Sequence, residues 1–274
     1  VPVYPSLSAE SVKYILNDCK AEVVFVSNAL QLDKILSVQK DCPDLKYIIS
    51  FNDVEKTDAK EQVKTFAEIF CDKKSVSKSE ILEKLEIISD TVNEDDLLTI
   101  IYTSGTTGVP KGVMLTHKNI YSNLVTFPGI LHTGEDDVFL SYLPYSHIFE
   151  RTAGYYLAFF FGSKTYYAQS IDTIGLQMTE VKPTVIITVP RLLDKIYNKL
   201  LKTSNEMEDG YKKKIYNWGL EVARTHWNNK KSVKWVLADK LVFAKIREKT
   251  GGRLRLFVSG GGALNKSIGE FFEG

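Results

Sequence analysis

The feature that most constrains this chain is the stretch from Ile100 to Gly112, which reads Ile-Ile-Tyr-Thr-Ser-Gly-Thr-Thr-Gly-Val-Pro-Lys-Gly. The apolar run from Leu97 to Tyr102 predicts a buried strand. Four hydroxyl side chains and two glycines follow, and Lys111 then adds a positive charge. Glycines let successive backbone N–H groups turn towards one anion, and hydroxyl groups add further donors. The stretch therefore predicts a loop that binds phosphate oxygens.

A polar surface turn is the simpler alternative, because clusters of Ser, Thr and Gly are commonly loops. Phosphate binding is favoured instead, because a predicted strand precedes the cluster and Lys111 and Gly112 follow it. A loop of the kinase or GTPase type is disfavoured, because those loops place Ser or Thr directly after Gly-Lys. Here Lys111 follows Pro110 and precedes Gly112.

The segment from Thr103 to Lys111 resembles the phosphate-loop signature of the adenylate-forming enzymes, the acyl-CoA synthetase superfamily. In that family the loop holds the β- and γ-phosphates of ATP while a carboxylate attacks the α-phosphorus. The resemblance gives Thr106 and Lys111 catalytic roles. It implies that ATP is bound by Thr103, Ser104, Gly105, Thr106, Thr107, Gly108 and Lys111.

A second informative stretch, Ser141 to Arg151, reads Ser-Tyr-Leu-Pro-Tyr-Ser-His-Ile-Phe-Glu-Arg. Taken alone, it fits a packed structural cluster at the end of a strand. Beside the phosphate loop, it resembles the motif Leu-Pro-Leu-Ala-His-x-Phe-Glu-Arg of long-chain fatty acyl-CoA synthetases. That resemblance implies a catalytic His147 near the acyl carboxylate. The apolar residues 151–161 predict a buried helix, whose rings would also line an acyl-chain channel in such an enzyme.

The C-terminal part predicts a helical region followed by a strand and a glycine-rich loop. Within residues 202–249, the positions expected to be buried are Trp218, Val222, Trp227, Trp235, Leu241 and Ile246. A helical insert of this length is typical of long-chain synthetases. Gly260, Gly261 and Gly262 fit a simple strand–helix turn, and in the family this loop lies beside adenine.

The alternation of predicted strands and helices indicates an α/β fold with a largely parallel sheet and helices on both faces. The resemblance implies part of the two-sheet N-terminal domain of an acyl-CoA synthetase-like fold. Residues 1–274 would be a partial AMP-binding (adenylation) domain, without the Tyr-Gly-x-Thr-Glu motif and the C-terminal lysine domain. We therefore expect an internal fragment that does not turn over when isolated.

Composition limits the partners. The net charge of +1 gives no electrostatic case for nucleic acid. Three cysteines without metal-like spacing indicate reduced thiols and a cytoplasmic protein, with no metal site. Lysine-rich residues 195–202 and 212–214 are most simply solvated helix faces, and attraction to anionic lipid is the alternative. The sequence shows no signal peptide, and the apolar run from Tyr155 to Phe161 falls short of the ~20 residues of a membrane span.

The resemblance implies a long-chain fatty acid–CoA ligase of fatty acid metabolism. Its substrates would be a fatty acid, ATP with Mg²⁺, and coenzyme A, and the whole protein would work in the cytoplasm or on the cytosolic face of the endoplasmic reticulum or another membrane. One alternative is a related enzyme that activates aryl or amino acids, which the helical insert and the Phe-Glu-Arg run disfavour. The other is a nucleotide-binding or scaffold module without turnover.

Overall fold

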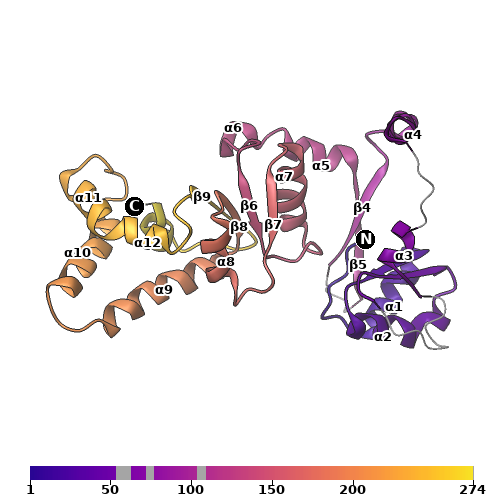
Figure 1. The fold of residues 1–274 in the computed structure, drawn as a ribbon, viewed down its shortest axis with the longest axis horizontal. Coiled ribbons are helices and arrows are strands. Elements are labelled where there is room, and N and C mark those ends of the chain that lie inside the picture. The colour runs from indigo at the N-terminus through magenta and orange to yellow at the C-terminus, as the bar shows by residue number, and fades with distance from the viewer. Residues whose placement is uncertain (54–62, 72–76, 104–108, 274) are drawn as a thin grey trace. The chain divides into compact units, whose positions relative to one another are not determined.

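The computed structural model describes residues 1–53, 63–71, 77–103 and 109–273, and the chain divides into two units, Val1–Asn123 and Leu124–Gly274. Each unit is built around a parallel sheet, which confirms the predicted α/β fold (Figure 1).

The first unit contains the three-stranded parallel sheet β1-β2-β3. Its strands and the helices between them are β1 (Val23–Val26), α1 (Ala9–Asp18), α2 (Ala29–Val38), η1 (Gln39–Asp41), β2 (Tyr47–Ser50) and β3 (Val63–Thr65). Ser8 caps α1 as the sequence predicts, because its side chain accepts the backbone N–H of Ser11. Apolar side chains of both helices share one core cluster with Val26 and Ile48 from the sheet.

A charged segment follows β2, and the sequence predicts only loops and short helices there. The described part contains β3, α3 (Phe66–Cys71) and α4 (Lys78–Thr91), so a strand and a helix of 14 residues exceed that prediction. Helix α4 begins with a capping box, in which Ser77 and Glu80 each accept a backbone N–H from the other.

The strand predicted before the phosphate loop is β4 (Leu97–Thr103), and it pairs with β5 (Lys111–Thr116) as an antiparallel hairpin. Ile101 and Tyr102 are buried, whereas Leu97 at the start of β4 is exposed. Thr116 caps the next helix, α5 (His117–Leu124), as predicted, since its hydroxyl accepts the N–H of Asn119. The hairpin is the one element of the described chain in which strand pairing is antiparallel.

The second unit contains a four-stranded parallel sheet with the order β7-β6-β8-β9. The strands are β6 (Val138–Ser141), β7 (Lys164–Tyr167), β8 (Val185–Thr188) and β9 (Leu256–Ser259). Consecutive side chains of a strand point to opposite faces of a sheet. Phe139 and Val185 accordingly pack with Ala153 and Ala158 on one face, while Leu140 and Ile186 pack with helices on the other.

Helices cover both faces of this sheet, as predicted. The first face is covered by η3 (Glu150–Tyr156) and α7 (Leu157–Phe160), and the second by α8 (Ile174–Val181) and the start of α9 (Pro190–Glu206). Pro190 opens α9 at its first helical position, where a missing N–H costs nothing.

Further helices complete the described part of this unit. They are α6 (Pro128–Leu131), α10 (Tyr211–Thr225), α11 (Val233–Ala238), η4 (Asp239–Phe243), α12 (Ala244–Glu248) and α13 (Lys266–Glu273). Of these, α10 to α13 and the later turns of α9 share a cluster that includes Leu220, Val242 and Phe271.

Two sequence predictions about burial are wrong in this unit. Leu241 is 45% exposed, because Ala238 and Val242 occupy the buried side of the same helix. The segment 151–161 is less buried than expected, since the Phe159 side chain is 81% exposed and Tyr155 and Phe160 also reach solvent. Most of that segment is a π-helix, a form that often occurs at functional sites.

Candidate active site

Two of the predicted phosphate-binding residues face each other across the β4–β5 hairpin. Thr103 is the last residue of β4, and Lys111 is the first of β5, paired with it in register. Ser104, Gly105, Thr106, Thr107 and Gly108 lie outside the described residues, so their roles stay predictions. Lys111 is exposed at this end of the hairpin.

The hairpin is anchored to helix α1. The hydroxyl of Tyr102 donates a hydrogen bond of 2.5 Å to the Asp18 carboxylate. Burial and this hydrogen bond raise the pKa of the Tyr102 phenol well above its ordinary value. The anchor lies one residue before Thr103, so it fixes where β4 ends and the loop begins.

The carboxyl ends of β6, β8 and β9 meet at one edge of the larger sheet, because all of its strands are parallel. The Tyr142 hydroxyl lies 2.8 Å from Thr188 Oγ1, which joins the ends of β6 and β8. The backbone N–H of Gly260 donates to the Thr188 carbonyl at 3.0 Å, which joins β8 to the glycine loop. In open α/β sheets this edge is where ligands usually bind.

His147 lies at this edge, in the turn between β6 and η3, and its side chain is exposed. Its backbone N–H donates to the Pro144 carbonyl, and its own carbonyl accepts from the N–H of Arg151. Nδ1 accepts the Phe149 N–H at 3.2 Å. Since Nδ1 accepts this N–H, Nε2 is the ring nitrogen that can donate, and it has no hydrogen-bond partner among the residues that the structure describes.

The histidine motif and the glycine loop pack directly on each other. A Cβ atom at Gly260 would lie 2.5 Å from the Phe149 ring, so only glycine allows the ring to approach this closely. Gly261 has a φ of +73°, which other residues rarely adopt, and Gly262 lies beside Pro190. The structure thus brings His147, through Phe149, into the same part of the second unit as the three glycines.

Glu150 is a buried carboxyl group that the motif contains but that sequence reasoning did not single out. It is 0% exposed, and Ser141 Oγ donates a hydrogen bond of 2.5 Å to its Oε1. Its Oε2 has no hydrogen-bond partner within the described part of the chain. Burial raises the pKa of Glu150 from 4.5 to about 7, although the Ser141 hydrogen bond opposes that rise. The available signal was an acidic residue directly before the run of small and aromatic residues that the sequence predicts to be buried.

The geometry around Glu150 depends on Gly154, one turn later in η3. A Cβ atom at Gly154 would overlap the Glu150 carboxyl group, so the carboxyl lies along the space that glycine leaves. Arg151, which follows Glu150 in the sequence, places its guanidinium carbon 5.3 Å from the ring centre of Tyr156 and 5.9 Å from that of Tyr155. Cation–π contact of this kind stabilises the start of the π-helix.

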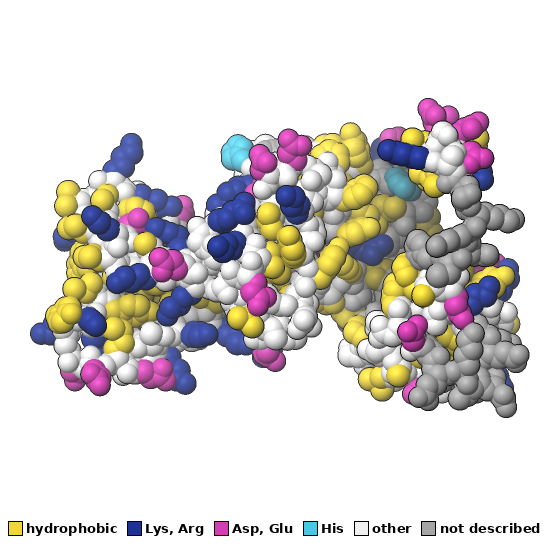
Figure 2. All heavy atoms as spheres, viewed as in Figure 1, with side chains coloured by type: hydrophobic (Ala, Val, Ile, Leu, Met, Phe, Trp, Pro, Cys, Tyr) yellow, Lys and Arg dark blue, Asp and Glu magenta, His cyan; other side chains and the backbone are white. Residues whose placement is uncertain are grey.

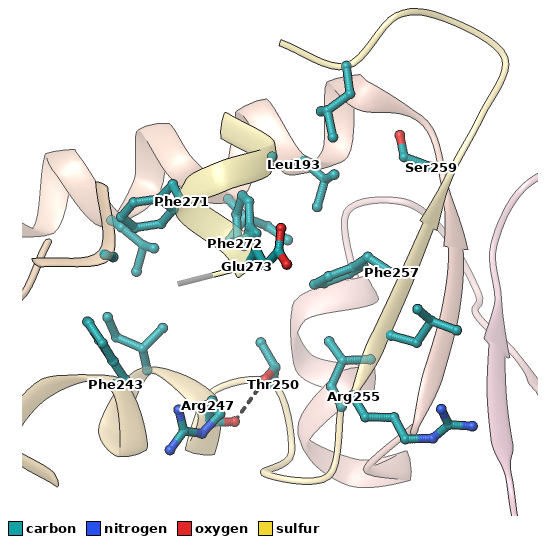
Figure 3. A pocket seen from close by; sticks show the side chains of 18 of the residues that line it. Leu193, Phe243, Arg247, Thr250, Arg255, Phe257, Ser259, Phe271, Phe272 and Glu273 are labelled. Carbon is teal, nitrogen blue, oxygen red and sulfur yellow. Dashed lines mark hydrogen bonds between the residues drawn. The ribbon is translucent and has the colours of Figure 1, made fainter. Parts of the chain in front are cut away.

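The second unit also contains a mainly apolar pocket of about 680 Å³ (Figure 3). It lies beside β9, where Phe257 and Phe272 point towards it, with Arg247 and Arg255 at its lower side in the view. Thr250 donates to the Arg247 carbonyl at 2.8 Å on this side. None of the predicted site residues lines the pocket, although Ser259 and Leu264 on either side of the glycine loop do.

The described residues contain no group of three or more His, Cys, Asp or Glu side chains that could hold a metal ion. Their helices also include none that is both long enough and apolar enough to cross a bilayer.

Comparison with known proteins identifies the family. The AMP-binding enzyme family matches residues 1–274, the entire length of the chain. The chain belongs to the AMP-binding enzyme family. This membership confirms the resemblance inferred from the phosphate loop and the histidine motif.

Relatives of this AMP-binding enzyme chain include two named long-chain ligases. The chain is 32% identical over 286 residues to long-chain-fatty-acid–CoA ligase ACSBG2 of Xenopus laevis. This alignment covers 99% of the chain and 38% of that protein. It is also 32% identical over 280 residues to long-chain-fatty-acid–CoA ligase 5 of Rattus norvegicus, over 99% of this chain and 40% of that protein. The chain therefore spans well under half the length of these relatives.

Among solved structures, the AMP-binding chain resembles the didomain of a carboxylic acid reductase from Segniliparus rugosus in complex with AMP. The TM-score is 0.66 at 22% identity, over 100% of this chain and 37% of that one. This likeness supports the fold of an adenylation domain.

Proposed function

We propose that this chain is the part of a long-chain fatty acid–CoA ligase that binds ATP and the fatty acid. The observation that carries the proposal is the match of the AMP-binding family over the whole chain, together with relatives named as such ligases. In the first half of the reaction a fatty carboxylate oxygen attacks the α-phosphorus of ATP, and pyrophosphate leaves. In the second, the thiolate of coenzyme A attacks the acyl carbon and AMP leaves.

The phosphates of ATP would be held at the β4–β5 hairpin. Lys111 contributes a full positive charge at the start of β5, directly across from Thr103. Ser104, Thr106 and Thr107 would supply hydroxyl donors, with Gly105 and Gly108 supplying backbone N–H groups. Charge-assisted hydrogen bonds are worth roughly 1.5–3 kcal/mol each, so Lys111 would supply one of the strongest single contacts with the departing pyrophosphate.

The fatty carboxylate would be oriented by His147. Nδ1 is occupied by the Phe149 N–H, so the available group is the Nε2–H, which can donate to a carboxylate oxygen. Holding the carboxylate in line with the α-phosphorus lowers the entropic part of the barrier. Gly260, Gly261 and Gly262 would lie against adenine, because their missing side chains leave room for a flat ring.

The aromatic residues of η3 and α7 would line the acyl-chain channel. Tyr155, Phe159 and Phe160 offer exposed rings on this segment, and each methylene of a bound chain gains about 0.8 kcal/mol from contact with such surface. Mg²⁺ would enter with ATP on the phosphate oxygens, as it commonly does in nucleotide enzymes. We further propose that the whole protein works in the cytoplasm and contacts a membrane surface, such as the cytosolic face of the endoplasmic reticulum.

The proposal is tested by the acids that the whole protein activates. ATP–pyrophosphate exchange is measured with palmitate, with benzoate and with amino acids. We expect exchange with palmitate and little with the other acids. Exchange that required benzoate or an amino acid would assign a different adenylating activity, and binding of ATP without any exchange would leave only a nucleotide-binding module.

A further inference from the structure

The segment from Lys230 to Lys245 carries an exposed apolar surface surrounded by lysines. Its helix runs without interruption through α11, η4 and α12. Four large apolar side chains are exposed there: Val233 (76%), Val236 (53%), Leu237 (48%) and Leu241 (45%). Five exposed lysines lie among them in the sequence, at Lys230, Lys231, Lys234, Lys240 and Lys245. We call these nine residues the basic apolar patch.

The apolar residues of the patch lie on the exposed side of a helix whose other side is already buried, and Lys230 and Lys231 directly precede that helix. Ala238, Val242 and Phe243 point into the helical core, and Trp235 packs against the Phe243 ring at 5.9 Å. Within α11, at about 3.6 residues per turn, Val233, Val236 and Leu237 lie opposite Ala238. In η4, which is a π-helix, Lys240 and Leu241 are exposed while Val242 and Phe243 are buried. The exposed apolar residues are thus not part of the core that holds this helix in place.

Charge is concentrated in this segment although the whole chain is close to neutral. Residues 226–249 contain seven Lys and Arg side chains against two acidic ones, whereas the chain has a net charge of +1. One of the two acidic residues, Asp239, is paired with Arg247 at 2.6 Å. Within the described residues, none of the five patch lysines lies within 4.0 Å of a carboxylate, so their charges are available to a partner.

We propose that the basic apolar patch docks onto the surface of a bilayer that contains anionic lipid. An apolar helix face enters the boundary between headgroups and acyl chains, while lysines beside it contact lipid phosphates and carboxylates. Figure 2 shows hydrophobic groups next to lysines and arginines over α11. Nucleic acid or an acidic protein would engage the lysines but would leave Leu237 and Leu241 without a favourable contact.

This inference gives a location to the membrane contact proposed above, and it does not depend on ligase chemistry. Binding is measured by flotation of the whole protein with vesicles of phosphatidylcholine alone or mixed with phosphatidylserine. We expect binding to the mixed vesicles that weakens with added salt, and little binding to neutral ones. Failure of palmitate activation would leave this result unchanged, so the two proposals fail separately.

The charge variant carries K230E, K231E, K234E and K240E. Each lysine near an anionic surface strengthens partitioning by about fivefold, so reversing four should weaken binding by more than about a hundredfold. The matched control carries K40E, K78E, K84E and K164E, which change the net charge equally at exposed sites elsewhere. Circular dichroism confirms that both variants are folded.

The apolar variant carries L237S and L241S, and its control carries L30S and L176S, which are also exposed leucines. We expect weaker binding to mixed vesicles for the first pair only. The proposal is overturned if the wild type does not bind mixed vesicles, if the charge variant and its control lose binding equally, or if L237S/L241S binds normally. It is also overturned if the patch variants convert a dimer to a monomer, since a second copy would then be the occupant.

Discussion

Replacing Glu150 with glutamine should change how the stability of the protein depends on pH. The Glu150 carboxyl group is fully buried, and burial raises its pKa from 4.5 to about 7. Between these values the folded protein holds a proton that the unfolded chain has released. The protein is therefore stabilised by this group below about pH 4.5, and the contribution is lost as the pH rises through about 7.

The size of the effect follows from the separation of the two pKa values. One pH unit of separation is worth about 1.4 kcal/mol, so a rise from 4.5 to about 7 corresponds to about 3 kcal/mol of unfolding free energy. Glu150→Gln cannot ionise, but it keeps an oxygen that accepts the Ser141 hydroxyl. The variant should therefore be more stable than the wild type at alkaline pH, by an amount that shrinks as the pH falls.

The assay is urea denaturation followed by circular dichroism at about pH 5 and about pH 8, on either side of most of the titration. The matched control is Glu180→Gln on α8, which removes one exposed carboxylate. We expect the difference in unfolding free energy between Glu150→Gln and the wild type to grow by about 2 kcal/mol between the two pH values. An equal difference at both would show that Glu150 does not hold a proton in the folded protein.

Two further substitutions test the packing at the two ends of the larger sheet. Gly260→Ala should displace the Phe149 ring and lower the unfolding free energy by about 1–3 kcal/mol, because the added Cβ has no room. The control Gly262→Ala should lower it less. Equal midpoints of the two variants in thermal unfolding would contradict the contact between Gly260 and Phe149. Asp137→Ala should lower the unfolding free energy by about 2 kcal/mol near neutral pH, because it removes the hydrogen bonds from Arg255, Thr184 and Gly134. Burial alone would raise the pKa of Asp137, but those hydrogen bonds hold that pKa below 3.8. The stability that the Asp137 carboxylate contributes should therefore disappear in strong acid. If Asp137→Ala were still less stable than the wild type in strong acid, these hydrogen bonds to the carboxylate would not be the source of the stability.

Local sequence signals were enough to predict an element where its sequence pattern is compatible with only one local structure. Helix α8 ends at Val181, two residues before Pro183, as a proline stop signal predicts from the sequence. Helix starts at Ser8, Thr116 and Pro190 follow from residue type alone, since capping depends only on neighbouring backbone groups. The parallel sheet followed from the alternation of strands and helices.

Predictions failed where the local sequence is compatible with more than one structure and tertiary packing decides which one forms. The helix containing Leu241 is apolar on several sides, so its sequence period cannot say which side faces the core. Strand β3 has three residues in a charged segment and gains its pairing from β2. The Glu150 carboxyl group lies in the space left by Gly154, which no helical periodicity reveals.

The candidate site was predictable in its parts but not in its assembly. The sequence identified His147 and Gly260–Gly262 separately, and the structure adds that Phe149 packs against Gly260. The role of Glu150 needed the structure, because burial and the Ser141 hydrogen bond come from a strand nine residues away. The predictions for residues 104–108 lie outside the described chain and await experiment.

Fatty-acid-dependent ATP–pyrophosphate exchange by the whole protein, with and without Lys111→Ala, tests the proposed ligase activity most directly. We expect palmitate-dependent exchange in the wild type and a loss of about a hundredfold or more in Lys111→Ala, the effect of removing a charged group that stabilises the leaving phosphates. Lys40→Ala, at an exposed site on η1, should exchange like the wild type. Unchanged exchange in Lys111→Ala would remove the hairpin from the active site, and no exchange in the wild type would contradict the ligase assignment.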